Sequence, residues 1–148
     1  MDQSSPLPFT IQPATTDEHI LATRAVMLDL RPNIAPGDYL PTIRRMMATD
    51  GYHLAALHAD GEVRAVAGYR FIKMLYCGRI MYVDDLNTDP AFRSQGYGRA
   101  LMDWLKAEAR AHDCSQLHLD SGVQREQTHR FYFREGLTIN ACHFRVPL

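Results

Sequence analysis

The first half of the chain alternates between short runs that suit strands and longer runs whose apolar residues recur at helical spacing. Residues 9–14 alternate as a strand does, and 16–18 then supply a threonine N-cap followed by two acidic residues. We expect the helix that starts there to run to about Leu30, where the proline- and glycine-bearing segment 31–37 breaks it. A second helix is expected over 38–49, because its apolar residues share one helical face.

The middle of the chain predicts an antiparallel meander of strands. Segments 52–59 and 63–75 are rich in apolar residues and are separated by Asp60-Gly61, a pair that favours a tight hairpin because both residues tolerate positive φ. A third strand is expected over 80–88. Pro90 ends it, since proline has no N–H to donate to a neighbouring strand.

Helices and strands then alternate in the last third of the chain. A helix over 97–112 shows an apolar stripe opposite a charged one, and a short strand follows over 116–121. A helix over 125–135 is expected to end at the left-handed C-cap Gly136, with a final strand over 137–146. The order predicts an α/β fold with a mixed, mostly antiparallel central sheet flanked by helices, including a parallel βαβ unit.

Composition and charge narrow the class of protein. At 148 residues the chain is expected to be a single domain over 1–148, and its 46% hydrophobic content suits a well-packed core. A net charge of −1 gives no overall attraction for nucleic acid or an anionic membrane. The apolar runs are too short to span a bilayer and the start lacks a signal-like pattern, so a cytoplasmic location is expected. The three cysteines form no metal-type spacing.

The segment between the 80–88 strand and the next helix carries the strongest chemical signal. Gly96 and Gly98 allow the backbone to approach an anion, and the helix that follows offers unpaired N–H groups and the positive end of its dipole. Arg93 and Arg99 flank the turn and add positive charge. The turn lacks the lysine and hydroxyl of a P-loop and the third glycine of a dinucleotide site, which disfavours kinase, NTPase and dehydrogenase functions.

Two motifs at this point resemble the GNAT acetyltransferase superfamily. The turn reads Arg93-Ser94-Gln95-Gly96-Tyr97-Gly98, similar to that family's pyrophosphate loop, and Phe131-Tyr132-x-x-x-Gly136-Leu137 is similar to a second family motif. The expected order of elements also matches over nearly the whole chain. The resemblance implies an acetyl-CoA-binding GNAT fold.

The resemblance also implies which residues bind the coenzyme. Backbone N–H groups of 94–100 hold the pyrophosphate, and the exposed main chain of the preceding strand, next to a family-typical bulge, pairs with the pantetheine arm. The implied cofactor-binding residues are Leu86, Asn87, Thr88, Arg93, Ser94, Gln95, Gly96, Tyr97, Gly98, Arg99 and Ala100.

Two catalytic roles follow from the same resemblance. Tyr132 matches a tyrosine proposed to protonate the departing thiolate, with a half-buried packing role as the alternative. An acceptor amine must lose its proton before attack, and Asp85 is the leading candidate base, with Asp84 second and a structural ion pair as the alternative. Because neighbouring strand residues face opposite sides, we expect only one of the two carboxylates to face the cleft.

The other polar residues give weaker signals. His118 and Asp120 are expected to share a face of the 116–121 strand and either line the acceptor side or serve structure. Arg125 stands where the family commonly has an asparagine, and it either reaches a phosphate or faces solvent. No metal-ligand spacing is present.

The expected function is therefore an N-acetyltransferase that uses acetyl-CoA as co-substrate and moves the acetyl group directly to a primary amine. A non-catalytic acyl-CoA-binding or sensing module is the alternative, and a phosphate-binding fold unrelated to CoA is a third. The acceptor, a small molecule or a peptide, is not specified by the sequence. An exposed edge strand near the C-terminus leaves a homodimer open.

Overall fold

The computed structural model describes residues 8–148, which form two compact units with their boundary between His118 and Leu119. Unit 1 contains β1 (Phe9–Pro13), α1 (Asp17–Ala22), α2 (Arg24–Leu30), η1 (Pro36–Asp38), α3 (Tyr39–Thr49), β2 (His53–Ala59), β3 (Glu62–Met74), β4 (Gly78–Thr88), η2 (Pro90–Phe92) and α4 (Tyr97–Ala111). Strand β5 (Gln116–Leu119) reaches the boundary, and unit 2 holds α5 (Glu126–Arg134). Within 8–148, no helix is both long and apolar enough to cross a lipid bilayer.

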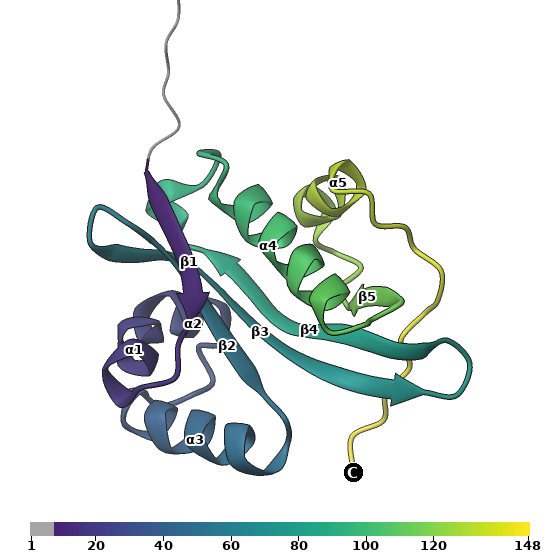
Figure 1. Cartoon of the computed structure of the whole chain (residues 1–148), viewed down its shortest axis with the longest axis horizontal. Coiled ribbons are helices and arrows are strands. Elements are labelled where there is room, and N and C mark those ends of the chain that lie inside the picture. Colours follow the sequence, from purple (N-terminus) through teal and green to yellow (C-terminus); the bar gives the residue numbers. More distant parts are fainter. Residues whose placement is uncertain (1–7) are drawn as a thin grey trace, which may run out of the picture. The chain divides into compact units, whose positions relative to one another are not determined.

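The strands form one five-stranded sheet in the order β1-β2-β3-β4-β5 (Figure 1). The first four strands pair with their neighbours antiparallel, whereas β4 and β5 run parallel, as the predicted βαβ unit requires. Asp60 and Gly61, with φ of 54° and 76°, make the predicted hairpin turn between β2 and β3. The predicted fold class is confirmed.

One face of the sheet packs against the helices that precede β2. Ile20 of α1, Met27 of α2 and Ile43 of α3 join Leu54 of β2 and Val66 of β3 in one buried cluster. All five side chains are less than 5% exposed. These helices therefore make the main hydrophobic core of unit 1 with that face.

The opposite face carries α4. Tyr69 and Phe71 lie two residues apart on β3, so they share a face. Their rings contact Trp104 of α4 and its C-cap residue His112 at centroid distances of 6.1 and 4.4 Å. The predicted apolar stripe of this helix is confirmed by three buried residues, Leu101, Leu105 and Ala109. The sheet is thus covered by helices on both faces.

The helix predicted over 16–30 is divided into α1 and α2 at Thr23. Its start is as expected, since the Thr16 hydroxyl accepts a hydrogen bond from the amide of His19 at 3.2 Å. The Thr23 hydroxyl donates to the carbonyl of Ile20 at 2.6 Å and lies 2.6 Å from the Tyr39 hydroxyl. Threonine hydroxyls that bond to the backbone of the preceding turn compete with regular helix, which explains the interruption.

The final strand predicted over 137–146 is wrong. These residues lie in unit 2 and form no strand, and Ile139, Phe144 and Val146 are 70%, 91% and 74% exposed. An alternating pattern of apolar residues is not enough for a strand, which also needs a neighbouring strand to hydrogen-bond with. Ile139 and Phe144 are also five residues apart, so one strand would have placed them on opposite faces.

Candidate active site

The turn between β4 and α4 presents main-chain groups to solvent. The Asp89 carboxylate accepts a hydrogen bond from the amide of Ala91 at 3.0 Å, and Ser94 and Gly96 then adopt positive φ of 64° and 86°. Gly96 is the N-cap of α4, and no side chain caps the helix at this position. The amide of Ala100 donates to the Gly96 carbonyl at 3.0 Å, so the first-turn amides before it remain for a ligand. At the positive end of a 15-residue helix, this arrangement suits the pyrophosphate of an acyl-CoA.

The charged side chains of the turn are exposed. The Nη2 of Arg93 lies 3.7 Å from Oδ2 of Asp29 on α2, and the Arg93 side chain is 58% exposed. The other exposed polar residues of the turn are Ser94, Gln95 and Arg99. Tyr97 is buried, and its ring lies edge-on to Phe9 at 6.5 Å. The side chain therefore packs in the interior, and the part of Tyr97 left to bind a ligand is its main-chain amide.

The end of β4 holds the other residues predicted to bind the coenzyme. Leu86, Asn87 and Thr88 pair with β3 through one edge of the strand. The Asn87 side chain is buried and its Nδ2 donates to the carbonyl of Val26 at 3.0 Å and to Oδ2 of Asp29 at 2.9 Å. This amide therefore ties β4 to α2, and contact of these residues with a pantetheine arm stays a prediction about the main chain.

Asp84 and Asp85 do not face opposite sides of the sheet as expected. The register of β3 with β4 shifts where Gly68 pairs with Asp85 and the next residue, Tyr69, pairs with Val83. Asp84 is the extra residue of this β-bulge, and a bulge breaks the alternation of side chains. Both carboxylates therefore lie on the face opposite α4, which is why the sequence-based expectation is wrong.

Asp85 lies in a hydrogen-bonded network that joins three elements. The Nε of Arg31, directly after α2, donates to Oδ1 of Asp85 at 2.8 Å, and its Nη2 donates to the carbonyl of Asp84 at 2.9 Å. The hydroxyl of Tyr52 donates to Oδ2 of Asp85 at 2.8 Å. A Cβ on Gly68 would lie 1.8 Å from the Tyr52 hydroxyl oxygen, so only glycine leaves room for this phenol.

The environments of the two carboxylates differ. Burial raises the pKa of Asp84 above its ordinary value, although the hydrogen bond and charge of Arg70 oppose this. The Nε of Arg70 lies 3.1 and 3.0 Å from the two carboxylate oxygens of Asp84. Burial, followed by the charge of Asp85, raises the pKa of Tyr52, so this phenol stays protonated and remains a donor. The cluster thus combines two carboxylates with two guanidinium groups and a neutral phenol.

Tyr132 lies on α5 in unit 2. Burial raises the pKa of its phenol, against an opposing effect of the Arg125 charge. The ring of Tyr132 lies 5.5 Å from that of Phe131, whereas Phe133 is 51% exposed. This agrees with the expectation that consecutive helical residues, about 100° apart, do not all face the core. A phenol that holds its proton suits the predicted role as an acid.

The remaining polar candidates have structural partners. The Nε2 of His118 lies 2.7 Å from Oε1 of Gln116. Strand β5 ends at Leu119, so Asp120 lies beyond the strand and not on its face, and its carboxylate is 3.1 Å from Nδ1 of His143. Among residues 8–148, no group of three or more potential ligands is arranged to hold a metal ion.

Sequence reasoning missed the partners of Asp85. Arg31 and Tyr52 are 54 and 33 residues away along the chain, and neither belongs to a recognisable motif. One signal was present in Gly68, because a glycine inside a strand often marks a close approach by another group.

Comparisons with known proteins agree with this geometry. The sequence profile described as "Acetyltransferase (GNAT) family" matches residues 24–136. An uncharacterized N-acetyltransferase, YhdJ, of Bacillus subtilis (strain 168) is 31% identical over 135 residues, which cover 90% of this chain and 95% of that protein. The aminoalkylphosphonate N-acetyltransferase of Salmonella typhimurium (strain LT2) is 35% identical over 63 residues, 43% of this chain and 40% of that protein.

A solved structure gives the same fold at low sequence identity. The aminoglycoside N-acetyltransferase AAC(6')-Iy in complex with CoA matches with a TM-score of 0.81 and 14% identity, over 95% of this chain and 96% of that one. The profile match spans most of the chain and includes the first motif and the second as far as Gly136. The chain therefore belongs to the GNAT acetyltransferase family and is an N-acetyltransferase that uses an acyl-CoA.

Proposed function

We propose that this protein transfers an acetyl group from acetyl-CoA directly to a primary amine of a small molecule or peptide, within a ternary complex. The observation that carries the proposal is the conformation of the turn at Gly96. This residue has a positive φ of 86° and is the N-cap of α4, where no side chain caps the helix. A turn of this kind binds a pyrophosphate through main-chain amides. The family match over residues 24–136 crosses the boundary between the two units, which supports one N-acetyltransferase domain over 1–148.

Residues of both units have defined tasks in this proposal. When bound, acetyl-CoA supplies a thioester whose carbonyl carbon receives the amine nitrogen and whose sulfur leaves. Asp85 accepts the proton of the acceptor ammonium, directly or through water, while Arg31 and Tyr52 hold its carboxylate in one orientation. Tyr132 donates a proton to the departing sulfur as the C–S bond breaks, and the second proton of the attacking nitrogen returns to its phenolate, so that the amide product and a free thiol result.

Asp84 is the second candidate for the base. Its raised pKa favours it, because a carboxylate with a higher pKa is a better proton acceptor near neutral pH.

Substituting Asp84 and Asp85 in turn shows which of the two carboxylates is the base. If Asp85 is the base, Asp85→Asn lowers kcat about 100-fold and removes the acidic limb of the pH–rate profile, while Asp84→Asn keeps that limb. The opposite pattern assigns the base to Asp84.

The direct test of the function is binding and turnover with acetyl-CoA. Calorimetry is expected to give saturable binding, and a thiol-release assay over a panel of amino acids, polyamines, aminoglycosides and peptides is expected to give turnover with at least one class. Tight binding without thiol release on any amine would indicate a non-catalytic acyl-CoA-binding module. Absence of binding at millimolar acetyl-CoA would contradict the proposal.

The role of Tyr132 has its own test with a matched control. Tyr132→Phe is expected to lower kcat about 100-fold with little change in the Kd for acetyl-CoA, because only the proton donor is lost. Tyr76→Phe makes the same chemical change at a side chain that is 70% exposed in the β3–β4 turn, and it is expected to leave both values unchanged. Equal losses in binding and turnover for Tyr132→Phe would exclude the acid role.

We also propose that the protein associates as a homodimer through its C-terminal segment. This segment carries several exposed apolar side chains, and exposed apolar surface commonly marks a protein interface. The residues are Ile139, Phe144, Val146 and Leu148. Sedimentation equilibrium is expected to give twice the chain mass for the wild type and a shift toward the single chain for Phe144→Ser. A single-chain mass for the wild type would refute the dimer.

A further inference from the structure

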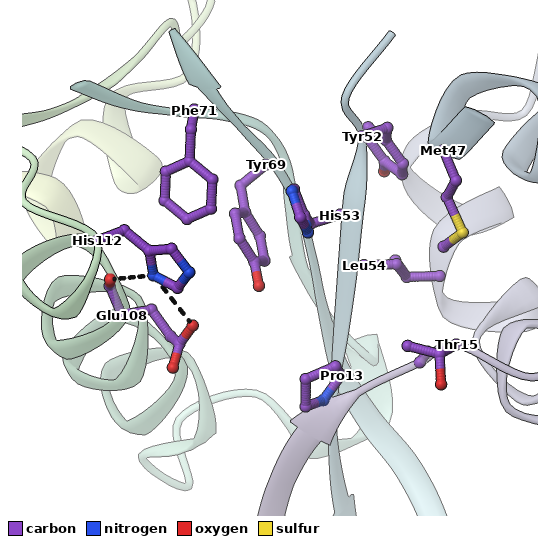
Figure 2. Close-up of a pocket in the computed structure, with 11 residues that line it drawn as sticks. Pro13, Thr15, Met47, Tyr52, His53, Leu54, Tyr69, Phe71, Glu108 and His112 are labelled. Carbon is purple, nitrogen blue, oxygen red and sulfur yellow. Dashed lines mark hydrogen bonds and ion pairs between the residues drawn. The ribbon is translucent and has the colours of Figure 1, made fainter. Parts of the chain in front are cut away.

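A pocket of about 420 Å³ lies in unit 1 where β1 ends (Figure 2). Strand β1 pairs with β2 as far as Pro13 opposite Ala55, and the amide of Ala14 still donates to the carbonyl of Leu54 at 2.8 Å. Beyond this point no strand of residues 8–148 neighbours this edge of β2. The pocket opens at this edge, between the start of β2 and the last turns of α4. The acyl-CoA turn lies at the other end of the same 15-residue helix, which is roughly 20 Å long at 1.5 Å per residue.

Aromatic rings form one wall of this pocket. His53 of β2 pairs with Tyr69 of β3, and their rings stack at 5.3 Å with an angle of 14°. Phe71 lies two residues further along β3 and stacks on His112, the C-cap residue of α4, at 4.4 Å. The guanidinium of Arg79 lies 5.1 Å from the centroid of Phe71, and its Nε donates to the carbonyl of His112 at 2.9 Å, so one cation already lies against this aromatic cluster.

Glu108 supplies the negative charge of the pocket. It is the one carboxylate among the lining residues, and the lining contains no lysine or arginine. Figure 2 shows its carboxylate and the Tyr69 hydroxyl directed toward the space between α4 and Pro13. Burial, followed by the charge of Glu108, raises the pKa of Tyr69 to about 12. Burial and the neighbouring His112 lower the pKa of His53, which keeps this imidazole neutral near pH 7.

We propose that this pocket is a second binding site, separate from the acyl-transfer site, for a small organic cation with an alkylated ammonium group. The carboxylate of Glu108 balances the charge of the cation, and the surrounding aromatic side chains bind its alkyl groups through cation–π contacts. Glu108 has one ion-pair partner in the lining, His112, whose Nδ1 lies 3.7 Å from Oε2 of Glu108, and an anion would be repelled by this carboxylate. A neutral aromatic ligand would stack but would bring no positive charge to Glu108.

Tyr52 is the one link to the active-site cluster. Its side chain lines the pocket, while its hydroxyl donates to Asp85 on β4 at 2.8 Å. The two sites are therefore tested with a ligand that cannot react. Choline and tetramethylammonium carry no N–H, so neither can accept an acyl group on nitrogen, and the binding experiment contains no acyl-CoA.

Trp104 provides the signal for the test. It is the only tryptophan of the chain, and its ring lies edge-on to Tyr69 at 6.1 Å. Its fluorescence is followed during titration with choline, with sodium chloride at equal ionic strength as the salt control. Choline is expected to give a saturable change. The neutral carbon isostere 3,3-dimethyl-1-butanol is expected to bind at least about tenfold more weakly, because it lacks the charge.

Variants then assign the site to Glu108. Glu108→Gln is expected to weaken choline binding about tenfold, whereas Asp103→Asn removes the same charge from an exposed position on the same helix and changes binding less than about twofold. Asp85→Asn is also expected to leave choline binding unchanged. Equal binding of choline and its neutral isostere to the wild type, or equal effects of the Glu108 and Asp103 substitutions, would overturn the proposal. These outcomes do not depend on acetyl transfer.

Discussion

The turn before α4 and the carboxylate pair on β4 belong to one strand–turn–helix segment, yet they are built in different ways. The turn offers main-chain amides, and its shape depends on two residues with left-handed φ, Ser94 and Gly96. The carboxylate pair depends on side chains delivered from distant parts of unit 1, with Arg31 and Tyr52 bound to Asp85. A local sequence can therefore specify an anion-binding turn, whereas positioning a proton acceptor requires the whole fold of the unit.

The largest effect is expected from changing the backbone of the turn. Gly96→Val places a β-branched residue at a φ of 86°, and the resulting rearrangement is expected to weaken acetyl-CoA binding about 100-fold. The control is Gly61→Val, which creates the same type of strain at a φ of 76° in the β2–β3 hairpin. Calorimetry is expected to show normal coenzyme affinity for the control. Unchanged affinity in Gly96→Val would show that the turn does not hold the coenzyme.

A smaller effect is expected from filling the space beside Asp85. In Gly68→Ala the new Cβ would lie 1.8 Å from the Tyr52 hydroxyl oxygen, so the phenol must move away from the carboxylate. We expect a loss of about 1–3 kcal/mol in the free energy of unfolding, measured by urea denaturation. The kcat is expected to fall about tenfold with the Kd for acetyl-CoA unchanged.

Gly37 is the matched control for that variant, since a Cβ there would meet no atom within 4 Å. Gly37→Ala is expected to leave both stability and kcat within error of the wild type. If Gly68→Ala behaves in the same way, Tyr52 does not position Asp85.

A more conservative substitution, at Arg31, tests the same network around Asp85. The Arg31 guanidinium contacts the Asp85 carboxylate and the Asp84 carbonyl through two nitrogens, a geometry that lysine cannot reproduce. Arg31→Lys keeps the charge and is expected to lower kcat about fivefold while coenzyme affinity stays constant. A variant with full activity would mean that charge alone suffices at this position.

The smallest effect is a pH dependence of stability. Burial raises the pKa of Tyr39 and of Tyr69 from 10.0 to about 12, so the fold favours their neutral forms. The stability that this contributes is complete below pH 10 and is lost as the pH rises toward 12. Urea midpoints are expected to fall over this range, together with a rise in tyrosinate absorbance. Constant midpoints up to pH 12 would contradict the burial of these phenols.

The same contrast explains which features the sequence could predict. The hairpin at Asp60-Gly61 and the glycine turn before α4 depend on residues within a few positions, and both were predicted. The Thr23 hydroxyl bonds to the nearby Ile20 carbonyl at the break and also contacts Tyr39, 16 residues away, and the network of Asp85 depends on residues more than 30 positions distant. The bulge that turns Asp84 and Asp85 to one face is set by pairing with β3, which no local pattern reveals.

The most direct test of the account measures acetyl-CoA affinity and turnover together in two variants. Gly96→Val is predicted to lose coenzyme affinity about 100-fold, whereas Asp85→Asn is predicted to keep that affinity within about twofold and to lose about 100-fold in kcat. This crossed result would assign binding to the main chain of the turn and proton transfer to the carboxylate. Parallel losses of affinity and turnover in both variants would contradict it.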